Sequence, residues 1–345
     1  MSKTKSNKLL LIVSAIIYII SLAAMIAGTL NDVKIDIALF NPENSIAKFF
    51  ENFGLAVYWG FWGPAFTIIF LCRRDLNESL AVIGKLIPKV KTVTNTDSKV
   101  YKFFNFVVKT ITTVGFFVLS VVGWKKLIEN VIKNILRNMN MDNWSQAAYF
   151  IICTVVAAIA IFLFRNIDKE KLRKLEALAL AGVLFGVLIK IVEECKTITN
   201  RVRFREMVAY SNGFLNEEGL SEGKYSPLTS AMAQNTDFSA FTQWYKIGDD
   251  MGMYNRADSF PSGHTTEAVI TFLTYPLFLA FDKLKKFAPI ALIASFAFTA
   301  AMAITRLITG AHYLTDVAGA ALITYSLFLI VYNIYSRFTK KSIIG

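Results

Sequence analysis

The chain has 345 residues, of which 54% are apolar and 14% aromatic, and its formal net charge is +12 at pH 7. This apolar fraction, with a mean hydropathy of +0.47, is typical of a protein that crosses a membrane several times and excludes an ordinary soluble domain. Lys and Arg residues cluster in short segments between apolar runs, so the positive charge indicates membrane topology and argues against nucleic acid as a partner.

Apolar runs of spanning length follow one another along the chain. A helix needs roughly 20 residues to cross about 30 Å of hydrocarbon, and it satisfies its own backbone, which lipid cannot do. The predicted spans are 9–29, 54–71, 104–123, 147–164, 174–192, 265–281, 287–305 and 313–335. We therefore predict an all-α fold, a polytopic membrane helix bundle of about eight transmembrane helices.

Basic segments alternate with longer polar segments between these spans. More than half of the 37 Lys and Arg residues lie in the segments 1–8, 72–102, 165–174, 282–286 and 336–345. The positive-inside rule places such segments in the cytoplasm. We therefore predict an integral, multi-pass protein of the plasma membrane with cytoplasmic N- and C-termini and an extracytoplasmic loop at 193–263.

The loop 193–263 is the one long stretch outside the predicted spans, and it contains many Gly, Asn, Ser and Pro residues. Loops of this length in compact proteins are usually functional or disordered. Aromatic residues in the loop favour a lid at the membrane interface, and an irregular surface cap is the alternative. These residues are Phe238, Phe241, Trp244 and Tyr245.

Three cations are expected on the outer side, Lys196 and Arg203 in the loop and Arg306 near the end of a span. Lys196 and Arg203 are seven residues apart, about two helical turns, so both are expected to face one site. Phosphoryl transfer depends mainly on positioning and on neutralising the phosphate oxygens, and these cations can do what Mg²⁺ does elsewhere. The segments lack the acid clusters that a divalent metal needs, so we expect no metal and no cofactor.

The stretch "PSGH" at 261–264 is predicted to start a helix, with Pro261 in its first turn. The backbone N–H groups of Ser262 and Gly263 are expected to face outward at the positive end of the helix dipole, where phosphate binds readily. His264 would lie beside the bound anion, and a protonated imidazole can donate to a leaving oxygen as a general acid.

The stretch "TRLITGAHYLTD" at 305–316 contains the second of only two histidines. His312 and Asp316 are four residues apart at the start of the last span, so we expect them on one helical face. The carboxylate can accept the proton of one ring nitrogen and leave the other nitrogen free to attack. The three cysteines, Cys72, Cys153 and Cys195, are expected to lie far apart, so we predict neither a disulfide nor a zinc site.

These stretches together resemble the type 2 phosphatidic acid phosphatase superfamily, which includes vanadium haloperoxidases and acid phosphatases. The pattern of that family is K-x(6)-R-P, then P-S-G-H, then S-R-x(5)-H-x(3)-D. This sequence reads "KTITNRVRF" at 196–204, "PSGH" at 261–264 and "TRLITGAHYLTD" at 305–316. Phe204 replaces the family proline, which puts the aim of Arg203 in question, and Thr305 replaces the family serine while keeping its hydroxyl.

The resemblance covers about 174–335 and implies a role for each matched residue. The residues that would hold the phosphate are Lys196, Arg203, Ser262, Gly263 and Arg306. His312 would attack phosphorus to give a phosphohistidine, and Asp316 would orient His312. His264 would protonate the leaving group and then activate the water that hydrolyses the intermediate. We therefore expect N-terminal transmembrane helices at 1–173 and a phosphatase core at 174–345.

Three functions remain open from the sequence. The first is a lipid phosphatase in the cell envelope, acting at the outer leaflet on phosphatidic acid, phosphatidylglycerophosphate or a polyprenyl pyrophosphate. The second is a phosphatase of a small soluble ester such as a sugar phosphate; an apolar groove leading to His312 would favour lipid, and a closed polar well would favour the sugar. The third is a transporter or scaffold without enzymatic activity, for which only Lys109 and Lys190 within spans provide the expected intramembrane charge.

Overall fold

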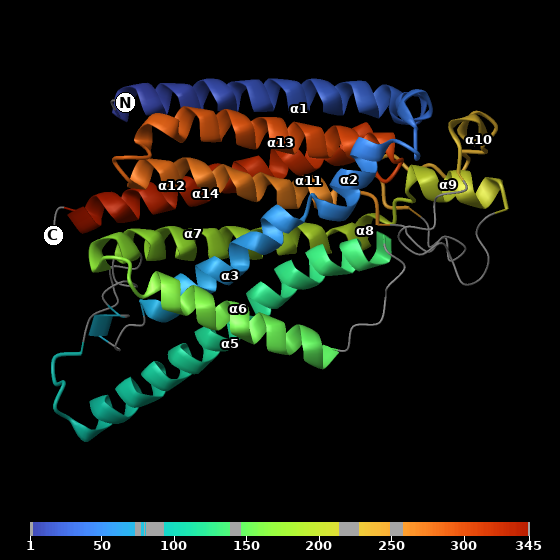
Figure 1. Cartoon of the computed structure of the whole chain (residues 1–345). Helices are drawn as coiled ribbons and strands as arrows, with labels where there is room; N and C mark the ends of the chain where they lie inside the picture. The colour runs from blue at the N-terminus through green and yellow to red at the C-terminus, as the bar shows by residue number, and fades with distance from the viewer. Residues whose placement is uncertain are drawn as a thin grey trace. The chain divides into compact units, whose positions relative to one another are not determined.

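The computed structural model describes residues 3–72, 77–78, 80, 93–138, 146–213, 228–248 and 258–343. Within these residues the regular structure is helical (Figure 1), and extended backbone pairs only in an isolated parallel bridge between Arg201 and Asp258. The prediction of an all-α fold is therefore confirmed.

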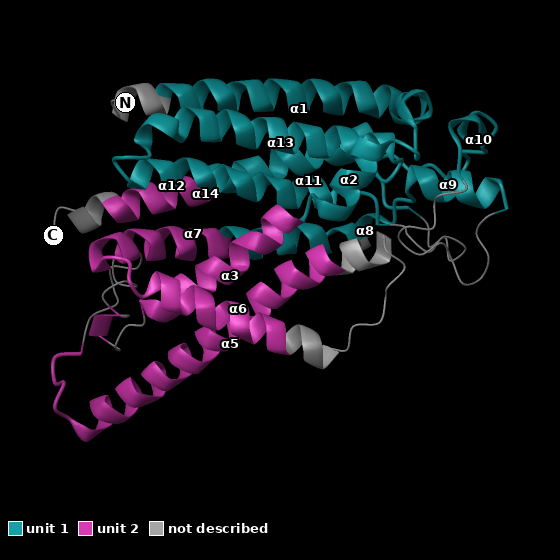
Figure 2. Cartoon of the chain, viewed as in Figure 1, with its two compact units in different colours: residues 1–55, 185–329 teal, residues 56–184, 330–345 magenta. Residues whose placement is uncertain are grey.

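The chain divides into two compact units (Figure 2). Unit 1 comprises 1–55 and 185–329, and unit 2 comprises 56–184 and 330–345. In unit 1 the N-terminal residues up to 55 pack with residues 185–329, and the domain boundary at 173 and 174 stays a prediction.

Unit 1 contains all residues of the three sequence motifs. It includes the end of α7 (Lys169–Glu194) and most of α14 (Leu314–Ile343). Its other helices are α1 (Lys3–Leu39), α2 (Ser45–Phe53), α8 (Lys196–Thr199), α9 (Phe204–Ser211), α10 (Ser230–Gln234), α11 (Gly263–Ala268), η1 (Val269–Leu273), α12 (Thr274–Ala280), η2 (Lys285–Phe287) and α13 (Ala288–Ile308).

Unit 2 contains α3 (Ala56–Leu71), α5 (Lys99–Asn138) and α6 (Gln146–Phe164), with the remainder of α7 and α14. Small residues allow close helix contacts in this unit, since a β-carbon built on Gly63 of α3 would lie 2.6 Å from the Trp124 ring of α5. The three cysteines of the chain are free thiols.

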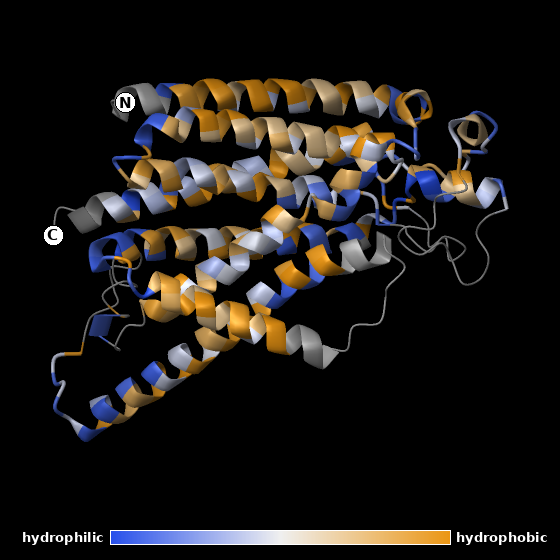
Figure 3. Ribbon diagram, viewed as in Figure 1, coloured by the Kyte–Doolittle hydropathy of each residue, from blue (hydrophilic) through white to orange (hydrophobic). Residues whose placement is uncertain are grey.

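Six helices of the described residues are long and apolar enough to cross a membrane. They are Lys8–Leu39, Ser45–Leu71, Lys99–Ile132, Lys169–Glu194, Lys285–Ile308 and Leu314–Thr339, with a shorter apolar helix at Ile151–Phe164. Apolar residues cover most of α1 and α13 (Figure 3), which agrees with a membrane protein. The expected count of eight is not confirmed, because the predicted span 265–281 consists of α11, η1 and α12, with a 3₁₀ stretch inside it.

Helix α1 is longer than the predicted span 9–29 and packs against α13 in unit 1. One side of it exposes large apolar residues such as Leu11 and Leu30, as expected for a lipid-facing surface. Polar side chains attach another side to α14, because the Ser14 and Tyr325 hydroxyls lie 2.9 Å apart and those of Tyr18 and Ser326 lie 2.7 Å apart. Interhelical hydrogen bonds of this kind hold helices together in lipid.

The described part of the loop 193–263 packs onto unit 1 through its aromatic residues. Phe238 stacks on Phe204 with ring centroids 5.0 Å apart, and Phe241 lies edge-on to Tyr313 at 5.2 Å. The Trp244 indole N–H donates to Thr29 of α1 at 2.9 Å. These three aromatics are half-buried and Tyr245 is exposed, so most of the aromatic set serves as packing in this structure, where an exposed lid had been predicted.

Candidate active site

The two histidine motifs meet at one end of unit 1, where α1 and α13 end and α11 and α14 begin (Figure 1). The Asn41 N–H, just after α1, donates to the Ile308 carbonyl of α13 at 2.8 Å. The Ser262 N–H donates to the Asp316 carbonyl at 3.1 Å. These backbone hydrogen bonds bring three distant parts of the sequence into one site.

His312 lies in the turn between α13 and α14, and its side chain is 2% exposed. Gly310 enables this turn, because its φ of +63° lies in the left-handed region that favours glycine. The His312 Nδ1 lies 2.7 Å from the Ser259 carbonyl oxygen, which can only accept, so Nδ1 carries the proton and Nε2 keeps its lone pair. Burial and the guanidinium of Arg203 hold the pKa of His312 well below its usual value, which favours the neutral, nucleophilic ring.

Asp316 does not contact His312 in the predicted way. Its Oδ2 lies 3.8 Å from Nδ1, beyond hydrogen-bond distance, and accepts from the Ser259 hydroxyl at 2.5 Å and from the Tyr313 N–H at 2.8 Å. The predicted shared helical face is absent because α14 begins at Leu314, after His312. Asp316 therefore holds Ser259, and the Ser259 carbonyl orients the histidine.

Arg201 is a buried residue that the motif analysis missed. Its side chain is fully buried, and its guanidinium forms ion pairs with Asp316 and, at 2.7 Å, with Asp32 of α1. The same guanidinium lies 4.2 Å from the Tyr313 ring centroid, a cation–π distance. Asp32 also accepts from the Thr315 N–H at 3.1 Å, so α1 is tied to the first turn of α14. The sequence signal for this cluster was Asp32, an acidic residue just after the predicted span 9–29.

Lys196 and Arg203 do not lie on one continuous helix. Helix α8 ends at Thr199, Asn200 has a left-handed φ of 45°, and Arg203 precedes the first turn of α9. Both cations nevertheless act on His312, since each lowers its pKa. Arg203 is held by Asp258 through two contacts of 3.0 and 3.1 Å, so a carboxylate fixes its aim although Phe204 replaces the family proline.

A helix starts at this motif, as predicted, but α11 begins at Gly263 with Ser262 as its cap, accepting the Thr265 N–H, so Pro261 precedes the helix and is not in its first turn. The N–H of Ser262 itself is not free for phosphate, because it donates to Asp316. Gly263 permits a close approach: a β-carbon built on it would overlap the ammonium of Lys196. The absence of a side chain at Gly263 therefore gives Lys196 its place beside His264.

Arg306 lies in the last turn of α13 with its side chain 1% exposed. It is 3.6 Å from Glu51 of α2, which also accepts from Arg205 of α9 at 2.7 Å. Burial and the charge of Arg306 hold the pKa of His264 well below its usual value, and His312 and Lys196 act in the same direction. Both imidazoles and the three predicted cations therefore influence one another electrostatically, as expected of a single site.

Among the residues that the structure describes, no group of three or more His, Cys, Asp and Glu side chains is arranged to hold a metal ion. The functional roles assigned to the site residues stay predictions; what the structure adds is their convergence at one end of unit 1.

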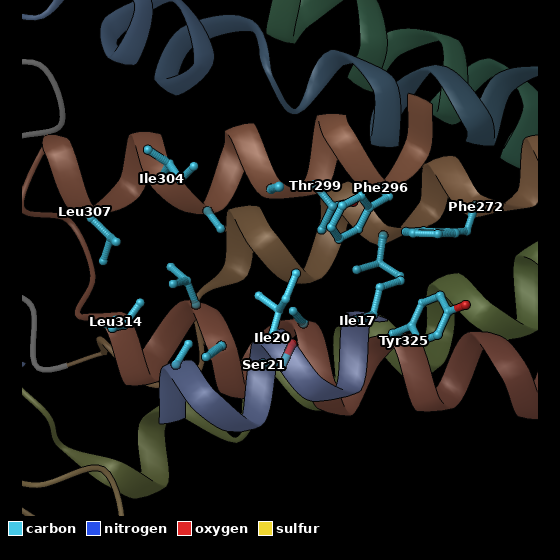
Figure 4. Close-up of a pocket in the computed structure, with 17 residues that line it drawn as sticks. Ile17, Ile20, Ser21, Phe272, Phe296, Thr299, Ile304, Leu307, Leu314 and Tyr325 are labelled. Carbon is cyan, nitrogen blue, oxygen red and sulfur yellow. The ribbon is translucent and has the colours of Figure 1, made fainter. Parts of the chain in front are cut away.

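An apolar groove of about 230 Å³ runs between α1, α13 and α14 in unit 1 (Figure 4). Leu307 and Leu314 line one end, and Phe272 and Tyr325 line the other. Leu307 follows Arg306 directly, and Leu314 is two residues after His312, so the groove begins beside the candidate site. The lining of α13 extends from Phe296 to Leu307, which corresponds to about 16 Å of helix.

Comparison with known families agrees with these motifs. Residues 221–340 match the model of the PAP2 superfamily. This part of the chain, about a third of its length, is therefore similar to the PAP2 superfamily. No curated protein and no solved structure matches the chain.

The PAP2 match contains the second and third motifs, with both histidines, Arg306 and Asp316, and confirms the resemblance seen in the sequence. Lys196 precedes the matched PAP2 residues, as does Arg203, and these two depend on the geometry described above. Because PAP2 proteins are phosphatases, the match and the apolar helices together indicate a membrane phosphatase.

Proposed function

We propose that this chain hydrolyses a phosphate monoester or pyrophosphate on a lipid, at the outer face of the plasma membrane, through a phosphohistidine and without a metal. The observation that carries the proposal is the apolar groove that begins beside Arg306 and His312. A lipid has a phosphate at the membrane surface and a chain that extends into the hydrocarbon, and the site and the groove offer one binding region for each.

The groove favours a lipid over a small soluble ester. Its lining consists of apolar side chains with a few hydroxyl residues, Ser21, Thr299 and Tyr325. A sugar phosphate would leave its hydroxyl groups without partners in such a groove, at a free-energy cost of about 1–3 kcal/mol for each buried group. Phosphatidic acid, phosphatidylglycerophosphate and polyprenyl pyrophosphate each provide an apolar chain next to the phosphate, and each fits this requirement.

In the first step, Nε2 of His312 attacks phosphorus, and the bond from phosphorus to the leaving oxygen breaks; this oxygen belongs to the alcohol of a monoester or to the lipid phosphate of a pyrophosphate. The Ser259 carbonyl holds Nδ1–H and stabilises the positive charge that develops on the ring. His264 gives its proton to the departing oxygen. Lys196, Arg203 and Arg306 neutralise the phosphoryl oxygens, so the barrier is lowered by fixed positive charges.

In the second step, water attacks the phosphohistidine. His264, now neutral, accepts a proton from that water, and the bond between phosphorus and Nε2 breaks. Inorganic phosphate leaves, His312 returns to its neutral form, and His264 carries a proton again. The cycle needs no redox partner and consumes one water for each phosphate released.

The proposed orientation combines charge and fold. The basic segments favour a cytoplasmic N-terminus, and α1 extends from the N-terminal part of the chain to the end of unit 1 that contains the histidines (Figure 1). One crossing by α1 would therefore put the site on the extracytoplasmic side, consistent with a function in the lipid metabolism of the cell envelope. A transporter or scaffold is disfavoured, because the convergent charges lie at helix ends.

The test is phosphate release by the purified protein in detergent from a panel of lipid phosphates and from a sugar phosphate, with and without EDTA. Release from lipids that persists in EDTA and disappears in His312→Ala supports the proposal. Vanadate should inhibit by mimicking the five-coordinate phosphorus. Preference for the sugar phosphate, or full activity of His312→Ala, would contradict it.

A further inference from the structure

Helix α2 brings a carboxylate to the candidate site from outside the residues that match the PAP2 superfamily. The Phe50 ring of α2 packs on Phe298 of α13 with centroids 5.8 Å apart. At the end of α2, a β-carbon built on Gly54 would overlap the methyl group of Met302 of α13. This close packing fixes Glu51, the residue after Phe50, over the last turn of α13.

The Glu51 carboxylate holds two buried guanidinium groups. Its Oε1 accepts from Arg205 at 2.7 Å and lies 3.6 Å from Arg306. The side chains of the two arginines are 3% and 1% exposed, and that of Glu51 is 28% exposed. Arg205 is itself tied to the turn between α13 and α14 that contains His312, since its N–H donates to the Gly310 carbonyl at 2.9 Å. The carboxylate therefore lies at the rim of the site, between α9 and α13.

In the proposed reaction His264 must be protonated when the alkoxide leaves, but most of its surroundings lower its pKa. Burial, the Arg306 guanidinium, His312 and Lys196 all lower the pKa of His264. Glu51 acts in the opposite direction and raises it. The charged groups that act on His264 thus come from α2, α8, α13 and the turn before α14, and α2 provides the negative one.

We propose that Glu51 is a positioning residue of the proposed reaction: it fixes Arg306 and, by its charge, keeps a proton on His264 until the alcohol departs. This inference rests on the proposed function. Glu51 exchanges no proton itself; the proton passes from His264 to the leaving oxygen as the phosphorus–oxygen bond breaks. This role of Glu51 also involves the N-terminal helices in the reaction, whereas the sequence motifs assign no function to these helices.

A change of leaving group separates this role from a merely structural one. The alkoxide of a diacylglycerol is a strong base and needs the proton of His264. The p-nitrophenolate ion is a weak base and leaves without one. Loss of Glu51 should therefore slow the first step for phosphatidic acid and spare p-nitrophenyl phosphate, whereas a distorted site would slow both.

The experiment compares the unmodified protein with Glu51→Gln under single-turnover conditions, so that release of the alcohol reports the first step alone. The control is Glu43→Gln. Glu43 is an exposed acid that precedes α2, and its carboxylate lies 3.1 Å from the Lys48 ammonium. The substrates are dihexanoyl phosphatidic acid and p-nitrophenyl phosphate, each measured across a range of pH. The rate with the aryl ester also shows whether the variant is folded.

We expect the rate of Glu51→Gln with phosphatidic acid to fall about ten-fold, a fraction of the roughly 100- to 10,000-fold that general acid catalysis contributes. The basic limb of its pH profile should move to lower pH, and the aryl ester rate should stay within about two-fold of the unmodified protein. Equal loss with both substrates, or no loss with either, would overturn the role of Glu51. If the unmodified protein releases neither alcohol, the proposed hydrolase itself fails.

Discussion

The imidazole of His312 is held by the main chain of Ser259, whose carbonyl oxygen lies 2.7 Å from Nδ1. Asp316 supports this contact indirectly, because its carboxylate accepts a hydrogen bond from the Ser259 hydroxyl at 2.5 Å. The proposed nucleophile is therefore oriented by a backbone group, which a side-chain substitution cannot remove directly.

Ser259→Ala should lower kcat without unfolding the protein, because it removes the hydrogen bond to Asp316 but keeps the carbonyl that holds His312. A loss of about 1–1.5 kcal/mol of orientation corresponds to roughly ten-fold in rate. The measurement is phosphate release, with thermal unfolding in detergent as the check on folding. An effect as large as that of His312→Ala would show that the carbonyl does not act independently of the side chain.

Arg201 and Arg203 should respond differently to substitution, although both are buried. Arg201→Met leaves Asp32 and Asp316 as buried charges without their cation, at a cost of about 3–5 kcal/mol in the free energy of unfolding. Arg203→Met removes the ion pair with Asp258, whose side chain is partly exposed, so activity should fall far more than stability. Unfolding midpoints and phosphate release of the two variants provide the comparison, and equal destabilisation would contradict the assignment.

Gly263→Ala should reduce activity with little effect on stability. The added β-carbon would overlap the Lys196 ammonium, which is the end of a flexible side chain and can move away. Its positive charge would then lie farther from the bound phosphate. Gly115→Ala in α5 is the matched control, because nothing lies within 4 Å of a β-carbon at that position. A rise in KM for the phosphate ester with an unchanged unfolding midpoint is the expected result, and normal KM would remove Lys196 from phosphate binding.

The pH dependence of the reaction follows from the two lowered histidine pKa values. His312 must be neutral, and its pKa lies well below the usual value of about 6.5, so the acid limb of kcat/KM should fall below that pH. His264 must be protonated, and its pKa is also lowered in the free protein. A bound phosphate adds negative charge that raises this pKa, so the basic limb of kcat should lie at higher pH than that of kcat/KM. Coincident basic limbs would argue against His264 as the acid.

A bulky residue in the groove should discriminate between substrates. Ala303 lines the groove on α13, three residues before Arg306. Ala303→Phe should lower kcat/KM for long-chain lipid phosphates and leave a short soluble ester unaffected, because only the chain needs the filled space. Release rates across a series of chain lengths provide the measurement, and uniform inhibition would instead indicate distortion of the site.

The groove and the distant site partners could not be predicted from the sequence for a common reason. Periodicity and spacing report neighbours along one helix, but Arg201 and Asp32 are 169 positions apart, and Arg205 and Glu51 are 154 apart. The two helical arguments in the sequence failed where the helix itself stops: α8 ends between Lys196 and Arg203, and α14 begins after His312. The structure brings the predicted residues to one end of unit 1, but the local geometry assumed for two of the motifs was wrong.

The helical fold, the membrane spans and the histidine motifs could be predicted from the sequence, because apolar length and short motifs are local properties of a chain. The packing of the helices was needed to show that Ser259 orients His312, that Arg201 ties α1 to α14, that Glu51 reaches Arg306, and that an apolar groove begins beside them. Those contacts depend on how helices distant in the sequence pack against one another, and in lipid that packing is set by shape and by interhelical polar contacts that the order of residues does not reveal.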